Sequence, residues 1–501
     1  MWDRIRGAIG VGMDAWRNGS SGYQAFTGNT PASWARTYDI LWATYTGDLF
    51  GAEWKRHHPP DSALYSNIRL MYSHVQSVVS FYETHVYMGS LSTNARRLPN
   101  GSTGAIPIEP QTGDETKDEA LLNATAALWT RWNWQQGMSQ RPLYGAALGV
   151  AFTEIVDDPA RHTVWPKMVW PGYVVDLELD IGGNVKSYAL EYQTTIVRSG
   201  NQVSGLYRKE VDKREYRFFF NDSPWSDRDG HGDAVQENPW GFVPAIWDQH
   251  RKINGDRGLP AMVGTKQAFE ELNSILSHAM DYQNKAFAAP IGVKGGVSQD
   301  GGDKETKQGP QYLNLLSIPL NGGFDMLQFD VGKTLEIVEW LKKGITETNP
   351  EASFYHELRA MSQLSGTAVE RALGDAVGRV TQARKGYDPN SVKLFQMSNA
   401  MCGHRLNGND WMNPTKRDEV FRPYDLNSYT SGDLDMTIIG ERGVVERTEE
   451  ERIRIVQMKE SLQFASSLEE LGYSAEEAAV MITEREAAML RRSNLMSGFG
   501  G

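Results

Sequence analysis

The sequence lacks the features that mark disulfide-stapled, membrane-spanning or nucleic-acid-coating proteins. It has one cysteine, Cys402, so it can form no internal disulfide or cysteine-rich metal site, which suits a reducing compartment. No apolar run is long enough to cross a bilayer. Acidic residues outnumber basic ones by 63 to 51, and the formal net charge of -12 argues against a general nucleic-acid coat, which needs clustered lysine and arginine. The first residues also lack the basic and apolar regions of a signal peptide, so we expect synthesis in a cytoplasm without export.

Nucleotide-binding and protease motifs are present only in incomplete form. Gly332–Thr334 ends like a phosphate loop, but Leu327 stands where that loop needs its first glycine. His356 begins like a metalloprotease helix, but Ala360 stands where the second histidine belongs. Cys402 is expected to be a buried thiol and not a nucleophile. We therefore expect no catalytic site and no cofactor.

One segment, Asp227 to Asp233, has alternating aspartates, a pattern found in some metal-binding loops. Alternating aspartates bind calcium when a glycine turn and a terminal glutamate follow, but the spacing here departs from that of an EF-hand loop. We expect a solvated turn without a metal ion.

The aromatic content leaves a carbohydrate-active hydrolase open as an alternative. The chain has 15 tryptophans and 63 carboxylates, and glycoside hydrolysis needs a carboxylate pair. Nothing in the sequence singles out two of them. Many of the aromatic residues fall in residues 1–60, and we expect them to be packing anchors or subunit contacts.

Residues 168–221 carry the clearest strand pattern. The runs that start at Val174 and Val185 alternate around Gly182-Gly183-Asn184, which predicts a tight hairpin. Residues 216–220 predict a further strand. Helical patterns on either side of this region predict an α+β fold.

Two amphipathic segments, residues 259–288 and 330–348, flank an insert over residues 289–329. Their apolar positions alternate steps of three and four, which predicts helices with one narrow packing stripe. Both are too charged to cross a bilayer, so both must pack on other protein. The packing residues expected on the two stripes are Phe269, Leu272, Leu276, Leu335, Val338 and Leu341.

A polar loop over residues 349–364 follows, because Pro350 breaks the preceding helix. A capping box at Thr367 to Glu370 opens a third helix over residues 365–400, which Gly386 can close as a C-cap. Two more helices are expected within residues 401–501. The insert carries Lys294, Lys304, Lys307 and Gln308, and we expect these residues to contact DNA or a partner.

Several stretches of the chain, taken in order, carry a resemblance. They are Asn238-Pro-Trp-Gly-Phe-Val-Pro, Gly258 to Asn284, Phe329-Asp-Val-Gly-Lys-Thr-Leu-Glu, Ser365-Gly-Thr-Ala and the segment from Glu446 to Glu477. Their order and spacing resemble those of the portal proteins of tailed double-stranded DNA bacteriophages, the ring through which the genome enters and leaves the capsid.

The resemblance implies a non-enzymatic subunit of a dodecameric ring. It assigns an α+β wing to residues 1–258, stem helices to 259–288 and 330–348, a clip to 289–329, a tunnel loop to 349–364, a wing-return helix to 365–400 and a crown to 401–501. The implied partners are double-stranded DNA, the terminase large subunit, the head-tail adaptor, the major capsid protein and scaffold. The implied location is the capsid portal vertex, without a membrane.

The tunnel loop would touch passing DNA without reading its bases, and net acidity would limit sticking. The residues expected to face DNA are Asn349, Glu351, Ser353, Phe354, Tyr355 and His356. Another virion component, such as a capsid or adaptor protein, stays open as a second alternative.

Overall fold

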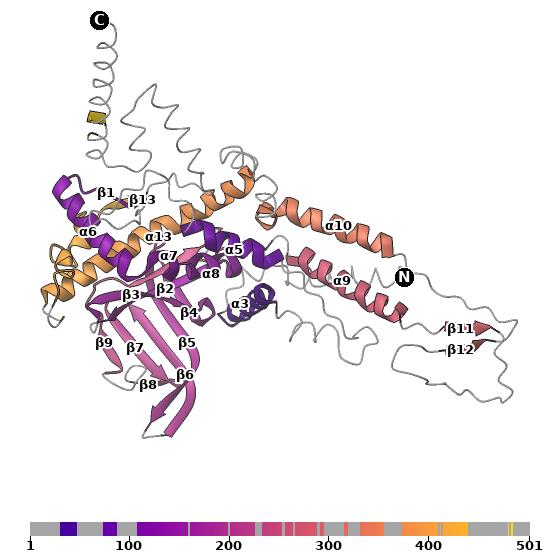
Figure 1. Ribbon diagram of the computed structural model, residues 1–501. Helices are drawn as coiled ribbons and strands as arrows, with labels where there is room; N and C mark the ends of the chain where they lie inside the picture. The colour runs from indigo at the N-terminus through magenta and orange to yellow at the C-terminus, as the bar shows by residue number, and fades with distance from the viewer. Residues whose placement is uncertain are drawn as a thin grey trace, which may run out of the picture. The chain divides into compact units, whose positions relative to one another are not determined.

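The computed structural model describes residues 31–47, 74–87, 108–158, 161–198, 201–225, 233–252, 256–263, 266–287, 291–294, 315–318, 331–354, 373–408, 411, 414–438, 479 and 482–483 (Figure 1). The chain divides into two compact units. Unit 1 comprises Met1–Trp42, Val78–Val263 and Phe354–Gly501, and unit 2 comprises Ala43–Ser77 and Gly264–Ser353. The fold is α+β, as the sequence predicts.

The strands of unit 1 form three sheets. A three-stranded antiparallel sheet has the order β10-β2-β3, and a larger sheet has the order β4-β5-β6-β7-β8, with β9 paired to β7. A short antiparallel pair joins β1 to β13. The bounds are β1 Ile108–Pro110, β2 Val150–Asp158, β3 Thr163–Val169, β4 Val174–Leu179, β5 Val185–Arg198, β6 Asn201–Asp212, β7 Glu215–Phe220, β8 Ser223–Pro224, β9 Val235–Glu237, β10 Ala245–Gln249 and β13 Met436–Ile438.

The hairpin predicted around Gly182-Gly183-Asn184 is confirmed. Strands β4 and β5 pair antiparallel, and Gly183 has a φ of +77°, which glycine adopts at little cost. The carboxylate of Asp180 closes the turn, because it accepts hydrogen bonds from the backbone and side-chain nitrogens of Asn184 at 2.8 and 2.7 Å. The further strand predicted over residues 216–220 is also present, as β7.

A buried glutamate links the two larger sheets. Glu154 of β2 accepts a hydrogen bond from the Tyr188 hydroxyl of β5 at 2.6 Å and pairs with Lys209 of β6. Burial alone would raise the pKa of Glu154, but Lys209 and Tyr188 lower it overall. The carboxylate therefore stays charged between the sheets.

Helices α6, α8 and α13 of unit 1 contact the two smaller sheets, through β1, β2, β3, β10 and β13. The bounds of the helices of unit 1, together with those of two helices that cross the unit boundary, are α3 Pro31–Thr46, α5 His74–Tyr87, α6 Glu115–Arg131, α7 Trp134–Gly137, α8 Gln140–Leu148, η3 Pro171–Tyr173, α13 Gly374–Asn407, η5 Glu419–Phe421 and α14 Ser428–Ser431.

Helix α13 corrects the predicted third helix. It runs for 34 residues and continues through Gly386 and Pro389 to Asn407, so Gly386 is not a C-cap and the boundary expected at residue 400 falls inside the helix. A β-carbon at Gly386 would lie 3.0 Å from the Gln249 carbonyl oxygen. The glycine therefore allows close approach of α13 to β10. Residues 365–372, where the helix was expected to begin, lie outside the described residues.

Tryptophan side chains anchor the core of unit 1. Trp132 stacks on Phe395 of α13 with ring centroids 5.1 Å apart, and Trp134 lies 4.7 Å from the same ring. The indole N–H of Trp132 donates to the Val164 carbonyl at 2.9 Å. These contacts join α6, α7, β3 and α13 in one core.

A fully buried ion pair lies deeper in the same unit. The Arg141 guanidinium of α8 makes two hydrogen bonds to Asp248 of β10, at 2.8 and 2.9 Å, and both side chains are 0% exposed. Asn390 and Ser391 of α13 add hydrogen bonds to the pair. Burial alone would lower the pKa of Arg141, but Asp248 and its hydrogen bonds raise it overall. The Arg141 guanidinium therefore stays charged.

His250 lies beside this network and gives the first prediction. Its Nδ1 is 3.0 Å from the Tyr387 hydroxyl, and burial lowers the pKa of His250 from 6.5 to about 3. Below pH 6.5 the unfolded chain takes up a proton that the folded chain refuses, so stability falls as pH falls toward 3, by about 1.4 kcal/mol per pH unit from this group.

The measurement is the free energy of unfolding in urea at several pH values, for the wild type and for His250→Asn, which keeps a polar atom near Nδ1. The difference between the two curves isolates the contribution of His250. Equal slopes below pH 6.5 would show that His250 is not buried in neutral form.

Unit 2 contains the helices on either side of the insert. Their bounds are α9 Lys266–Phe287 and α10 Val331–Thr348, followed by the 3-10 turn η4 Pro350–Ala352. The insert carries a two-stranded parallel pair, β11 Ile291–Lys294 and β12 Leu315–Ile318. Helix α10 begins one residue from its predicted start.

The first of these helices begins later than predicted. Leu259 to Val263 is a turn, and its backbone is tied down by the bonds from Leu259 N–H to the Arg251 carbonyl and from Ala261 N–H to the Ala146 carbonyl. Pro260 supplies no N–H for a helix. These bonds hold the segment in a non-helical path, so the described helix starts at Lys266.

Candidate functional site

The packing residues expected on α9 and α10 divide into three groups. Phe269, Leu272 and Val338 are buried, at 1%, 0% and 3% exposed, as predicted for an inward stripe. Leu276 and Leu341 are half-buried. Leu335 is 54% exposed, so it is not part of the packing within the chain. The two helices lie against one another within unit 2.

Helix α10 carries exposed apolar residues that the sequence stripe did not include. Ile337 is 50% exposed and Trp340 is 73% exposed. At about 100° per residue, Leu335 and Ile337 lie on opposite flanks of the buried face of Val338 and Ile345, and Trp340 lies about 60° beyond Ile337, toward the far side of the helix. The sequence signal was present as two apolar residues off the expected stripe, but a one-stripe pattern had no place for them.

The loop predicted to face DNA is largely buried where the structure describes it. Asn349, Glu351 and Phe354 are 3%, 1% and 1% exposed, and Ser353 is half-buried. These three side chains are not exposed in this conformation, and their contact with DNA in a channel stays a prediction. The other two residues of this set, Tyr355 and His356, lie outside the described residues.

Local bonding and one aromatic anchor explain this burial. The Asn349 amide donates to the Ile345 carbonyl at 3.2 Å, which extends the end of α10 into the turn η4. The Phe354 ring packs on Phe81 with centroids 4.7 Å apart and on His85 at 5.2 Å. The start of the predicted loop is therefore a packed turn.

The expected partner contacts of the insert are described only in part. Lys294 ends β11, where its backbone is in register with Ile318 of β12. The other members of this set, Lys304, Lys307 and Gln308, lie outside the described residues.

Two stretches of the sequence that resemble parts of catalytic sites lie in helices. Gly332 and Lys333 lie exposed in the first turn of α10. Cys402 is buried inside α13, and burial raises the pKa of its thiol to about 12, as expected for an unreactive thiol.

No known family model matches the chain. A search of curated proteins also found no match.

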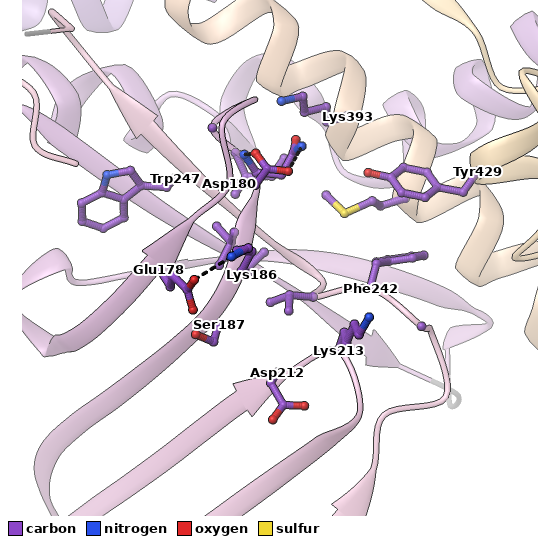
Figure 2. A pocket seen from close by; sticks show the side chains of 18 of the residues that line it. Glu178, Asp180, Lys186, Ser187, Asp212, Lys213, Phe242, Trp247, Lys393 and Tyr429 are labelled. Carbon is purple, nitrogen blue, oxygen red and sulfur yellow. Dashed lines mark hydrogen bonds and ion pairs between the residues drawn. The ribbon is translucent and has the colours of Figure 1, made fainter. Parts of the chain in front are cut away.

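Unit 1 holds a cavity of about 700 Å³, shown in Figure 2. Four segments form it: the β4–β5 hairpin, the turn between β6 and β7, the stretch from Gly241 to Trp247, and one side of α13 with Tyr429. Its apolar lining includes the buried side chains of Val243, Trp247 and Met397. The rings of Phe242 and Tyr429 lie together along one side, with centroids 4.7 Å apart. The cavity has no signal in the sequence, because its residues come from distant segments.

The carboxylates of this cavity are held by their own turns. Asp180 is bonded to Asn184, and hydrogen bonds to Asn184 lower the pKa of Asp180. Asp212 accepts from the backbone N–H groups of Arg214 and Glu215, which also lowers its pKa. A glycosidase acid needs a raised pKa. These two carboxylates are therefore poorly suited to the hydrolase alternative.

Among the described residues, no group of three or more histidine, cysteine or acidic side chains could hold a metal ion. Of the segment from Asp227 to Asp233, the description includes Asp233 alone. No helix within the described part of the chain is long and apolar enough to span a bilayer.

Proposed function

We propose that the chain is the structural subunit of a ring, a phage-type portal whose channel conducts double-stranded DNA during packaging and ejection. In this proposal, α9 and α10 form the stem, the insert bearing β11 and β12 forms the clip, and unit 1 supplies the wing. The clip docks the terminase large subunit and later the head-tail adaptor. The order helix, insert, helix supports this assignment.

The observation that carries the proposal is the pair of exposed apolar flanks on α10. A ring subunit contacts one neighbour on each side through two different surfaces, which is a heterologous interface that closes. Leu335 on one flank, and Ile337 with Trp340 on the other, provide two such surfaces. Large apolar side chains at this exposure are otherwise costly to leave in water.

The burial of the described tunnel-loop residues changes which parts of the channel would contact DNA. With Asn349, Glu351 and Phe354 buried, contacts to DNA fall to other parts of the channel wall in this conformation. A net charge of -12 keeps phosphate contacts few, and this favours sliding over binding.

The test is the assembly state of the purified full chain, by native mass spectrometry and negative-stain microscopy. We expect rings of uniform size with a central channel. A chain that stays monomeric at all concentrations contradicts the proposal, and closed shells would indicate a capsid protein.

Trp340→Glu gives a second prediction for the same interface. Burying a charge in place of an interface tryptophan should weaken each subunit contact by about 2 kcal/mol or more, so rings should dissociate at concentrations where the wild type is assembled. The measurement is the ring fraction against concentration by mass photometry. Lys343→Gln is the matched control, because it changes the charge by the same one unit on an exposed part of the same helix. Equal assembly of both variants would exclude this flank from the interface.

A further inference from the structure

The cavity of unit 1 has a charge pattern that the ring proposal does not use. Its lining includes the carboxylates Glu178, Asp180 and Asp212 and the cations Lys186, Lys213, Arg214 and Lys393. Figure 2 shows Lys393 near Asp180 toward one end and Lys213 near Asp212 toward the other. The apolar lining and the Phe242–Tyr429 ring pair lie between these ends.

The carboxylates of the cavity make shorter hydrogen bonds and ion pairs than Lys393 does. Glu178 is paired with Lys186 at 2.7 Å, Asp180 closes its own turn, and Asp212 accepts two backbone N–H groups. Lys393, in contrast, makes a long 3.4 Å contact to the Gly182 carbonyl. The lining carries four cations and three carboxylates, so its formal charge is +1.

Lys393 is placed so that an anion would be favoured beside it. Its side chain rises from α13 and is half-buried, and burial lowers the pKa of Lys393, with Lys252 acting in the same direction and Asp180 in the opposite one. A partly dehydrated ammonium gains more from an anion than an exposed one does. The neighbouring carboxylates repel a doubly charged phosphate, so a single carboxylate fits the site better.

We propose that this cavity binds a short peptide segment of a partner protein, with a glutamate or aspartate on Lys393 and a bulky apolar side chain against Phe242 and Tyr429. A volume of about 700 Å³ falls in the range of sites that enclose a ligand of a few residues. Charge complementarity selects the acidic residue, and the ring pair selects its apolar neighbour. Binding does not depend on ring assembly, because every lining residue belongs to unit 1 of one chain.

The test uses the full chain and the peptide acetyl-Gly-Phe-Glu-Gly-amide, with acetyl-Gly-Phe-Gln-Gly-amide as its matched control. Isothermal titration calorimetry should give a dissociation constant at least about tenfold lower for the glutamate peptide. Lys393→Met should remove this preference. Lys385→Met, an exposed lysine of the same helix outside the cavity, should leave it unchanged.

A second measurement does not rely on a variant. Lysines carrying ¹³C-methyl groups report their pKa by NMR, and the glutamate peptide should raise the pKa of Lys393 without moving that of Lys385. Equal binding of the two peptides, no binding of either, or an unchanged Lys393 signal overturns the proposal. Acetate or inorganic phosphate binding as tightly as the peptide also overturns it, because the apolar wall would then contribute nothing.

Discussion

Asp248→Ala should cost about 3–5 kcal/mol of unfolding free energy, because it leaves the Arg141 guanidinium buried without its counter-charge. Both side chains are 0% exposed, so water cannot replace the lost carboxylate. The total free energy of unfolding of a typical domain is about 5–15 kcal/mol, so we also expect a lower yield of soluble protein. The measurement is urea unfolding followed by tryptophan fluorescence.

Two controls separate the buried charge from the loss of a contact. The double variant Arg141→Met with Asp248→Leu removes both charges while keeping apolar volume, and it should be more stable than Asp248→Ala. Glu178→Ala breaks the Lys186 pair, whose side chains are 55% and 61% exposed, and should cost less than about 1 kcal/mol. If Asp248→Ala costs no more than Glu178→Ala, the pair is not desolvated.

Gly149→Ala should lower the free energy of unfolding by about 2 kcal/mol or more, because two penalties coincide at this residue. Gly149 ends α8 with a φ of +89°, which is strained for alanine. Its added β-carbon would also lie 2.3 Å from the Gly258 carbonyl oxygen. Backbone atoms on both sides leave no flexible side chain that could move away.

Gly183→Ala is the matched control for this substitution. Gly183 has a similar φ of +77°, but a β-carbon there would meet nothing within 4 Å. It should therefore show the backbone penalty alone, about 1 kcal/mol. The difference in thermal unfolding temperature between the two variants measures the close approach of Gly149 to Gly258. Equal losses would show that the two backbones do not pack as described.

Local chemistry made several elements predictable. The β4–β5 hairpin follows from alternating residues around a glycine that tolerates positive φ, and α10 follows from a charged helix with one apolar stripe. Neither needs a distant partner to be recognised. The burial of Phe269, Leu272 and Val338 was predictable for the same reason.

Other features depend on residues that meet only after folding. Gly386 and Pro389 indicate a helix end when taken alone, but packing of α13 on β10 carries the helix through both. Phe354 sits in a polar stretch, yet the aromatic rings of α5 bury it. At both places, tertiary packing stabilises the observed structure by more free energy than the unfavourable local preference costs.

By itself, the sequence determined the α+β class, the hairpin and the helices on either side of the insert, because periodicity and turn chemistry act between near neighbours. Only the tertiary structure decided which charges are buried and where a cavity lies. Arg141 and Asp248 are 107 positions apart, and the cavity draws on four segments between Glu178 and Tyr429. Such contacts have no local signature, since the chain between the partners can take many paths before packing selects one.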